Sequence, residues 1–203
     1  MAFSSSKWFL AAILVVLSAL CLFYLSSQNQ PHHDEVVGDI HIHGDFKVFL
    51  NNISYNFSQQ KYMSSENHTL NPFFHLHDMD GSVLHQHMSG VKIGSFFKSL
   101  GMSLNSTCFV LDNSSSYCNT NTTSLKMYIR HNGSIWQESN DFDQYSMSDL
   151  DQILITYGNN TDQETQSQMS QVTDRACIQS KKCPERGSPE DESSCSGDGP
   201  CKA

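Results

Sequence analysis

The stretch "DLDQILITYG", residues 149–158, carries the signal that decides the fold class of this chain. In an extended strand, successive side chains point to opposite faces. In the second half of this stretch nearly every side chain is apolar: Ile153, Leu154, Ile155, Thr156 and Tyr157. A strand that is apolar on both faces is typical of the interior of a sheet that is covered on each side. The sequence therefore predicts a sheet with an inner strand at this position.

Two pairs of segments upstream predict further strands. The segments "FKVFL" (46–50) and "ISYNFS" (53–58) are joined by two asparagines, which tolerate the positive φ of tight hairpin turns. The segments "STCFVLD" (106–112) and "SLKMYIR" (124–130) flank a turn rich in serine and asparagine. The Asn-Gly pair at 132–133 marks one more tight turn. These alternating segments and their turns predict a sheet of several strands.

One short helix is predicted between the strand pairs. The segment "VKIGSFFKSLG", residues 91–101, places four apolar side chains on one helical face, at positions i, i+3, i+4 and i+7: Ile93, Phe96, Phe97 and Leu100. Gly101 suits the C-terminal cap of this helix. Strands, one short packed helix and further strands indicate an α+β domain with a small mixed sheet, which we expect to span residues 41–158.

The last part of this domain resembles a known fold. The pattern "LKMYI…NG…YSMSDLDQILITYG", which ends at residue 158, is similar to the second half of a β-grasp domain. This resemblance concerns the fold alone and implies no activity.

Beyond Gly158 the composition changes. Thr161 and Glu164 form a capping-box pattern, which predicts a helix over residues 162–175. A thin apolar stripe runs along this helix: Met169, Val172 and Ala176. The rest of the segment 159–203 contains proline, glycine and charges but little to bury, so it is predicted to be a cysteine-containing tail.

Three His-x-His pairs are the main candidates for a functional site. One pair, "HIH", stands at the start of the domain, and two more lie in "FFHLHDMDGSVLHQHM", residues 73–88. Residues i and i+2 of a strand project from the same face, so each pair presents two imidazoles side by side. The candidate ligands are His41, His43, His75, His77, His85 and His87.

The register of a hairpin decides whether the two pairs of residues 73–88 meet. A two-residue turn at Asp80–Gly81 would place the pairs on opposite faces. A three-residue loop, Met79–Gly81, would set His75 directly opposite His85, with the glycine in the left-handed conformation. Three imidazoles would then converge on one face, those of His75, His77 and His85. The first pair would complete the cluster if its strand lay alongside, which the sequence leaves open.

A transition metal is the expected ligand of such a cluster. Imidazole ligands suit Zn, Cu(II) or Ni, and the order of intrinsic affinities favours copper over zinc. Met79 and Met88 lie beside the cluster and would add soft ligands for Cu(I), or they serve as ordinary apolar side chains. We expect Asp45 and Asp78 to accept hydrogen bonds from imidazole N–H groups and so to orient the ligands. A metal-bound hydroxide and hydrolytic activity are less expected, because no glutamate stands close in sequence.

The histidine pattern also resembles that of other proteins. The run "HIHGDFKVFLNN…HLHD…GSVLHQHMSG…IGSFFKSLGM" covers about residues 41–101. It resembles a group of microbial membrane-anchored or secreted proteins of uncharacterised activity, which share His-x-His, His-x-His-Asp, His-x-His and Gly-x-Phe-Phe motifs. The resemblance implies that the run is one structural module and implies no function.

The N-terminal segment predicts that the domain lies outside the cytoplasm. Residues 8–25, "WFLAAILVVLSALCLFYL", carry no charge, and at about 1.5 Å per residue they can span a hydrocarbon core of roughly 30 Å. A cleaved signal peptide is the alternative, but no Ala-x-Ala pattern follows. Because Lys7 lies on the short side, we expect residues 1–25 to be a cytoplasmic stub with a membrane anchor, and residues 26–40 to be an exterior linker.

Three further features agree with an exterior location. Asn-x-Ser/Thr sequons begin at Asn52, Asn56, Asn67, Asn105, Asn113, Asn121, Asn132 and Asn159. Six of the seven cysteines lie outside the apolar segment, and nearest neighbours are expected to pair as disulfides: Cys108 with Cys118, Cys177 with Cys183, and Cys195 with Cys201. The net charge of -9 and the absence of a basic stripe argue against nucleic acid as a partner.

These features predict a single-pass protein whose exterior domain binds copper or zinc, for metal capture, for delivery to a protein partner or for electron transfer. A thiol/disulfide redox role of the C-terminal cysteines is one alternative, although the chain contains no Cys-x-x-Cys motif. The other alternative is a glycosylated surface protein that binds a macromolecule and whose histidines lie on a solvated sheet face. An enzyme is less expected, and the sequence leaves the oligomeric state open.

Overall fold

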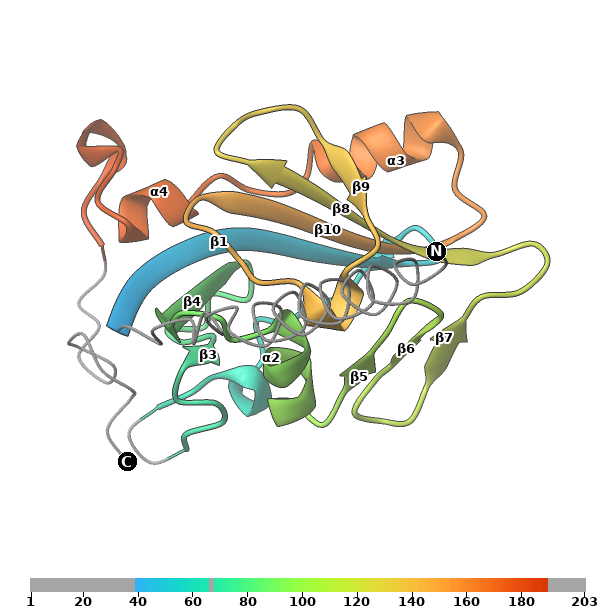
Figure 1. Ribbon diagram of the computed structural model, residues 1–203, viewed down its shortest axis with the longest axis horizontal. Helices are drawn as coiled ribbons and strands as arrows, with labels where there is room; N and C mark the ends of the chain where they lie inside the picture. The colour runs from blue at the N-terminus through green and yellow to red at the C-terminus, as the bar shows by residue number, and fades with distance from the viewer. Residues whose placement is uncertain (1–38, 66–67, 190–203) are drawn as a thin grey trace, which may run out of the picture. The chain divides into compact units, whose positions relative to one another are not determined.

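In the computed structural model, the predicted inner strand lies at the centre of a mixed sheet (Figure 1). The structure describes residues 39–65 and 68–189, which all belong to one unit, Val37–Ala203. The predicted anchor at 8–25, the sequon at Asn67 and the last two cysteines lie outside the described residues. Within the described ranges, no helix has the length and apolar character needed to cross a membrane.

Strand β10 (Asp151–Gly158) is buried at every position and has two long neighbours. It runs parallel to β1 (Asp39–Leu50) and antiparallel to β8 (Ser124–His131). Parallel neighbours require a crossover, and the chain between β1 and β10 supplies one that includes helix α2 (Ile93–Ser99). The strand order of the main sheet is β3–β4–β1–β10–β8–β9, and β2 also pairs with β1. The shorter strands are β2 (Ile53–Ser54), β3 (Phe74–His75), β4 (Val83–Met88) and β9 (Gln137–Ser139). This architecture confirms the predicted α+β class.

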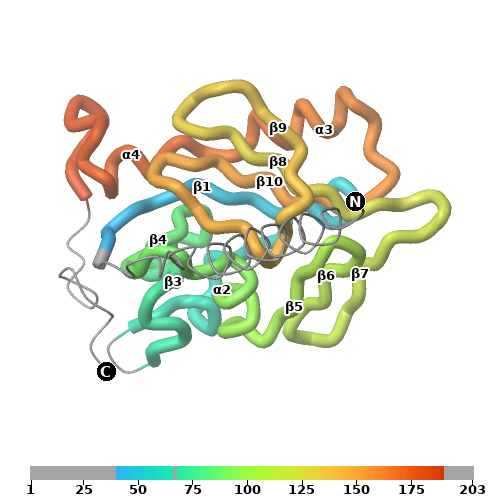
Figure 2. Tube along the Cα trace, in the orientation of Figure 1, coloured from blue at the N-terminus to red at the C-terminus, as the bar shows by residue number. Residues whose placement is uncertain are grey.

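One face of the main sheet packs on a large hydrophobic core. Side chains of β1, β10 and α2 meet there, among them Phe46, Val48, Ile153, Ile155, Phe96 and Phe97. The chain then continues from α2 into a small second sheet (Figure 2), which has the order β5–β6–β7: β5 (Ser103–Leu104), β6 (Cys108–Val110) and β7 (Ser116–Cys118). Two 3-10 turns, η1 (Gln60–Tyr62) and η2 (Phe142–Gln144), add buried aromatic rings to the same core.

The C-terminal segment covers the opposite face of the sheet. Helix α3 (Asp162–Met169) begins with the predicted capping box, in which the Glu164 N–H donates to Thr161 Oγ1 (3.2 Å) and the Glu164 carboxylate accepts from the Thr161 N–H (2.7 Å). A second apolar cluster lies beneath it, made of Phe49, Leu154, Met169 and Val172. Two short elements follow, α4 (Ala176–Gln179), which contacts β1, and η3 (Pro184–Arg186).

The predicted helix over residues 162–175 is too long, because α3 ends at Met169. Beyond α3, the side chain of Val172 packs in the second apolar cluster, and Gln152 Nε2 donates to the carbonyl of Thr173 (2.6 Å). These contacts draw the chain across the sheet. A continued helix would have directed that carbonyl along its own axis and lost the bond to β10.

The segments 106–112 and 124–130 lie in different sheets, although the turn-like sequence between them suggested a hairpin. Strand β6 pairs with β7, and β8 pairs with β10 and β9. The additional strand β7 forms because the chain returns within a few residues and places Cys118 directly opposite Cys108. The predicted positive-φ turn positions are confirmed at Asn51, Asn52, Gly101, Asn132 and Gly133.

Candidate metal centre

Three neighbouring strands bring the six histidines of the His-x-His pairs together. In the ladder of β1 and β4, His43 lies opposite His85, and in the ladder of β3 and β4, His75 lies opposite His85 from the other side. Because side chains alternate along a strand, the remaining histidines of β1 and β4 share this face. The register is that of the three-residue alternative, and β1 is the neighbouring strand that the sequence left open.

Three of these histidines form a compact group of candidate ligands. One ring nitrogen from each of His41, His43 and His85 lies within 4.8 Å of the others. The rings of His43 and His85 are buried, and His41 is half-buried. Ring centroids are 4.7 Å apart for His41 and His43, and 4.6 Å apart for His43 and His85. We call these three residues the histidine triad.

The other three histidines surround the triad on the β3–β4 side. His77 lies next to His85, with Nε2 of His77 3.0 Å from Nδ1 of His85. The ring centroid of His87 is 4.6 Å from that of His41 and 5.0 Å from that of His75. All six imidazoles therefore form one continuous cluster.

The link between β3 and β4 differs from the predicted turn in its backbone. The left-handed residues are Asp78 and Met79, with φ of 54° and 59°, and Gly81 is not among them. Gly81 is required for a different reason. A Cβ at this position would lie 2.4 Å from the carbonyl carbon of Phe57 and 2.3 Å from the nitrogen of Ser58, so two loops touch through their backbones here.

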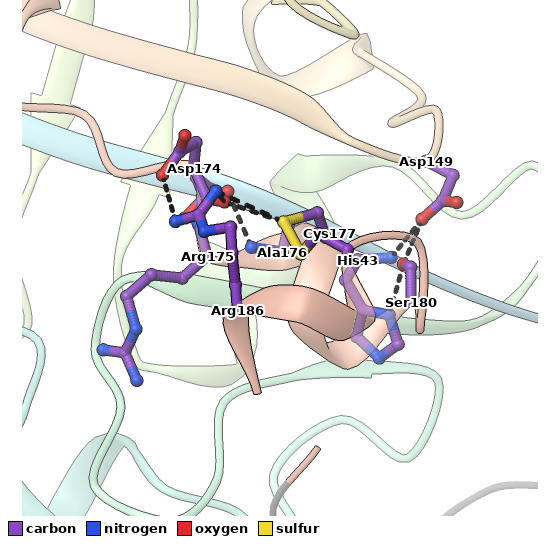
Figure 3. Close-up of a disulfide and its surroundings, with 10 residues drawn as sticks. His43, Asp149, Asp174, Arg175, Ala176, Cys177, Ser180 and Arg186 are labelled. Atoms are coloured by element: carbon purple, nitrogen blue, oxygen red, sulfur yellow. Dashed lines mark hydrogen bonds and ion pairs between the residues drawn. A yellow bond between two sulfur atoms is a disulfide. The ribbon is translucent and has the colours of Figure 1, made fainter. Parts of the chain in front are cut away.

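Ser180 and Asp149 orient the ring of His43. The hydroxyl of Ser180 donates to Asp149 Oδ1 (2.5 Å), because a carboxylate can only accept. The oxygen of Ser180 therefore accepts from Nδ1–H of His43 (2.8 Å), as Figure 3 shows. This assigns the proton of a neutral ring to Nδ1, the arrangement that second-shell partners impose on histidines that bind a metal through Nε2.

Three further rings also have a hydrogen-bond partner at Nδ1. His75 Nδ1 donates to the carbonyl of Asn71 (3.0 Å), and His77 Nδ1 donates to the carboxylate of Asp78 (2.5 Å). Nε2 of His77 lies 3.0 Å from Nδ1 of His85, so these two rings share a hydrogen bond. Nδ1 of each of these three rings therefore lies at a hydrogen-bond partner, as in metal-binding histidines that second-shell contacts orient.

The two predicted second-shell acids have different roles. Asp78 does accept a hydrogen bond from an imidazole, that of His77. Asp45 instead accepts from the hydroxyl of Thr173 and from the N–H groups of Arg175 and Ala176 (2.9 Å each). Burial raises the pKa of Asp45, and these hydrogen bonds oppose the rise. Asp45 therefore fixes the C-terminal segment to the histidine face of the sheet.

Asp149 was not predicted from the sequence. Burial alone would raise its pKa, but hydrogen bonds from Lys182, Ser180 and the backbone N–H of His43 together hold the pKa below its ordinary value. Lys182 Nζ lies 2.5 Å from Asp149 Oδ2. A carboxylate paired with Lys182 thus stands behind the His43 ring and holds Ser180 in place.

Two of the predicted disulfides are present, Cys108–Cys118 in the small sheet and Cys177–Cys183 in the C-terminal segment. The second closes a loop over residues 177–183, which carries Ser180 toward His43 (Figure 3). The predicted pair of Cys195 and Cys201 falls outside the described residues.

Comparison with models of protein families, with curated proteins and with solved structures finds no match for this chain. The arrangement of the site therefore carries the functional argument. A cluster of imidazoles suits zinc and copper, which bind imidazole well, better than calcium or magnesium, which prefer oxygen ligands.

Proposed function

We propose that this protein is a membrane-anchored, extracytoplasmic binder of copper or zinc. The observation that carries the proposal is the histidine triad, whose three ring nitrogens lie within 4.8 Å of one another. His43, as a triad member, is held in the tautomer that exposes Nε2 by a hydrogen-bonded chain through Ser180 to Asp149. Such ordering reduces the entropy lost on metal binding and is the usual function of second-shell partners.

Metal capture or delivery is the proposed use of this site. The triad is built from imidazoles, which bind a metal in their neutral form, and His43 and His85 are buried. The surrounding His75, His77 and His87 extend the cluster by further ligands of the same type. A cation could therefore move between neighbouring imidazoles on its way to or from a protein partner.

The proposed location rests on the apolar segment of residues 8–25 together with two properties of the described domain. Both described cysteine pairs are disulfides, as expected in an oxidising compartment. The described sequon asparagines are all exposed, as glycosylation would require: Asn52, Asn56, Asn105, Asn113, Asn121, Asn132 and Asn159.

Metal analysis of the full-length chain tests the proposal. The untagged protein is purified in mild detergent, and its copper and zinc contents are measured before and after titration with each ion. We expect one ion to remain bound, and we expect weaker binding in His75→Ala and His85→Ala. His68→Ala, at an exposed position away from the cluster, is the matched control. Unchanged stoichiometry and affinity in both cluster variants would contradict a metal site.

A further inference from the structure

The loop that the Cys177–Cys183 disulfide closes is attached to the candidate metal centre at one end of the sheet. Ser180, near its middle, accepts from Nδ1 of His43 and donates to Asp149. Lys182, near its end, forms an ion pair with the same carboxylate. We call residues 177–183 the capping loop, because they determine how the His43 ring is held.

The conformation of the capping loop depends on its closure. Lys181 has a φ of 56°, a left-handed conformation that costs free energy for a residue with a side chain. It lies between Ser180 and Lys182, so the position of both contacts depends on it. The backbone N–H of Lys182 bonds to the carbonyl of Cys177 (2.8 Å), and the disulfide joins Cys177 to Cys183 across this turn. The covalent link restricts the open states of the loop and so favours the strained turn.

The disulfide also has a partner that would stabilise its reduced form. Nη1 of Arg186 lies 3.4 Å from Sγ of Cys177, and Cys177 is partly exposed whereas Cys183 is buried. A guanidinium beside a sulfur stabilises the thiolate, and thiolates are the reactive form in thiol–disulfide exchange. Arg186 also pairs with Asp174 (2.7 Å), so only part of its charge acts on the sulfur. Cys177 is the sulfur that an incoming thiolate can reach, and Cys183 then leaves as the thiolate.

We propose that the Cys177–Cys183 disulfide is a redox gate of the histidine site. The site holds its metal while the disulfide is intact and releases the metal when the disulfide is reduced. This inference rests on the proposed metal-binding function. A dithiol reductant supplies two electrons and two protons, so the S–S bond becomes two thiols and the dithiol becomes a disulfide. The capping loop then opens, Ser180 leaves His43, and the His43 ring loses the hydrogen bond that orients it. Ser180 and the disulfide act as positioning groups, through His43.

The loss of one orienting partner sets the size of the effect. Removal of outer-shell partners of metal ligands typically costs about 10- to 100-fold in metal affinity. We expect loss of the Ser180–His43 contact to fall in that range and to appear mainly as faster metal release.

The experiment compares two double variants of the full-length chain. Cys177→Ser/Cys183→Ser removes the disulfide of the capping loop, and Cys108→Ser/Cys118→Ser removes the disulfide of the small sheet as the matched control. Each protein is loaded with zinc or copper, and metal release into an excess of a chromogenic chelator is followed in time. We expect release about 10-fold or more faster in the first variant, and release at the wild-type rate in the second.

A second pair of variants tests the same step without altering a disulfide. Ser180→Ala removes the hydroxyl and should accelerate release, whereas Ser180→Thr keeps a hydroxyl and should restore slow release. Circular dichroism and the absorption bands of a Cu(II)-loaded sample report whether each fold and the ligand geometry are kept. This pair decides the question if the first double variant fails to fold.

The outcomes separate the gate from the metal site. A wild-type chain that takes up neither copper nor zinc overturns the proposed function, and the gate with it. If the wild-type chain binds metal, and Cys177→Ser/Cys183→Ser and Ser180→Ala release it no faster than the wild type does, only the gate is overturned. Equal acceleration in both double variants overturns it as well, because the effect would then be general loss of stability.

Discussion

His43 lies directly across the β1–β4 ladder from His85, and their ring centroids are 4.6 Å apart. The two rings come from segments about forty residues apart in the chain, and both are buried. Six imidazoles on one sheet face are costly to bury unless hydrogen bonds or a cation compensate them. The pairing of His43 with His85 therefore provides the geometric basis of the proposed site.

The triad and the surrounding histidines should differ in their effect on metal affinity. We expect His43→Ala and His85→Ala to weaken zinc or copper binding by more than the roughly 10- to 100-fold that loss of an outer-shell partner costs, and His77→Ala to weaken it within that range. The reason is that His43 and His85 belong to the group within 4.8 Å, whereas His77 contacts that group through Nδ1 of His85. Isothermal titration of the full-length variants measures the ranking. Equal losses at all three positions would mean that the triad is not the primary site.

The backbone contact at Gly81 predicts a stability defect that does not involve metal. Gly81→Ala would place a Cβ 2.3 Å from the Ser58 nitrogen, so one of two loops must move. Such overpacking typically costs about 1–3 kcal/mol. Urea unfolding of the metal-free protein measures the loss, with Met79→Ala, at an exposed position of the same link, as the control. A loss no larger than that of the control would show that the loops separate easily.

Local patterns predicted much of this fold because they depend on neighbours in sequence. Alternation placed Ile153 and its neighbours in an inner strand, and the capping box at Thr161 located the start of α3. Alternation also placed each His-x-His pair on one face. The bond between His43 and Ser180 joins residues 137 positions apart, and no local rule relates them. The same holds for the use of Gly81, since its constraint comes from a separate loop.

Asp112 should contribute a pH-dependent part of the stability, remote from the histidine cluster. The hydrogen bond from Lys61 lowers its pKa despite partial burial, and the Tyr62 hydroxyl adds to the effect. A carboxyl with a pKa lowered by folding stabilises the folded state above its unfolded pKa, about 3.8, and loses that contribution as pH falls through the lower folded value. Asp112→Asn should therefore be modestly less stable than the wild type at pH 7, with the difference shrinking below pH 3.8.

Urea unfolding of both proteins at neutral and acidic pH measures this difference. The pair is partly solvated, with the Lys61 side chain 53% exposed, so salt should also reduce it. A difference that stays constant from pH 7 into the acid range would show that Asp112 stabilises the fold by packing and not by its charge.

The capping box of α3 should matter for stability and not for metal binding. Thr161→Ala removes the side chain that accepts the Glu164 N–H and leaves the Glu164 carboxylate without its hydroxyl partner. Loss of such an N-cap costs about 1 kcal/mol of unfolding free energy. The helix packs over Phe49 and Leu154, which belong to the second apolar cluster. We therefore expect a lower urea midpoint with unchanged metal affinity, whereas Ser180→Ala should show weaker metal binding with a smaller change in midpoint. If Thr161→Ala lowered metal affinity as much as Ser180→Ala, the effect of Ser180→Ala would not be specific to the contact between the capping loop and His43.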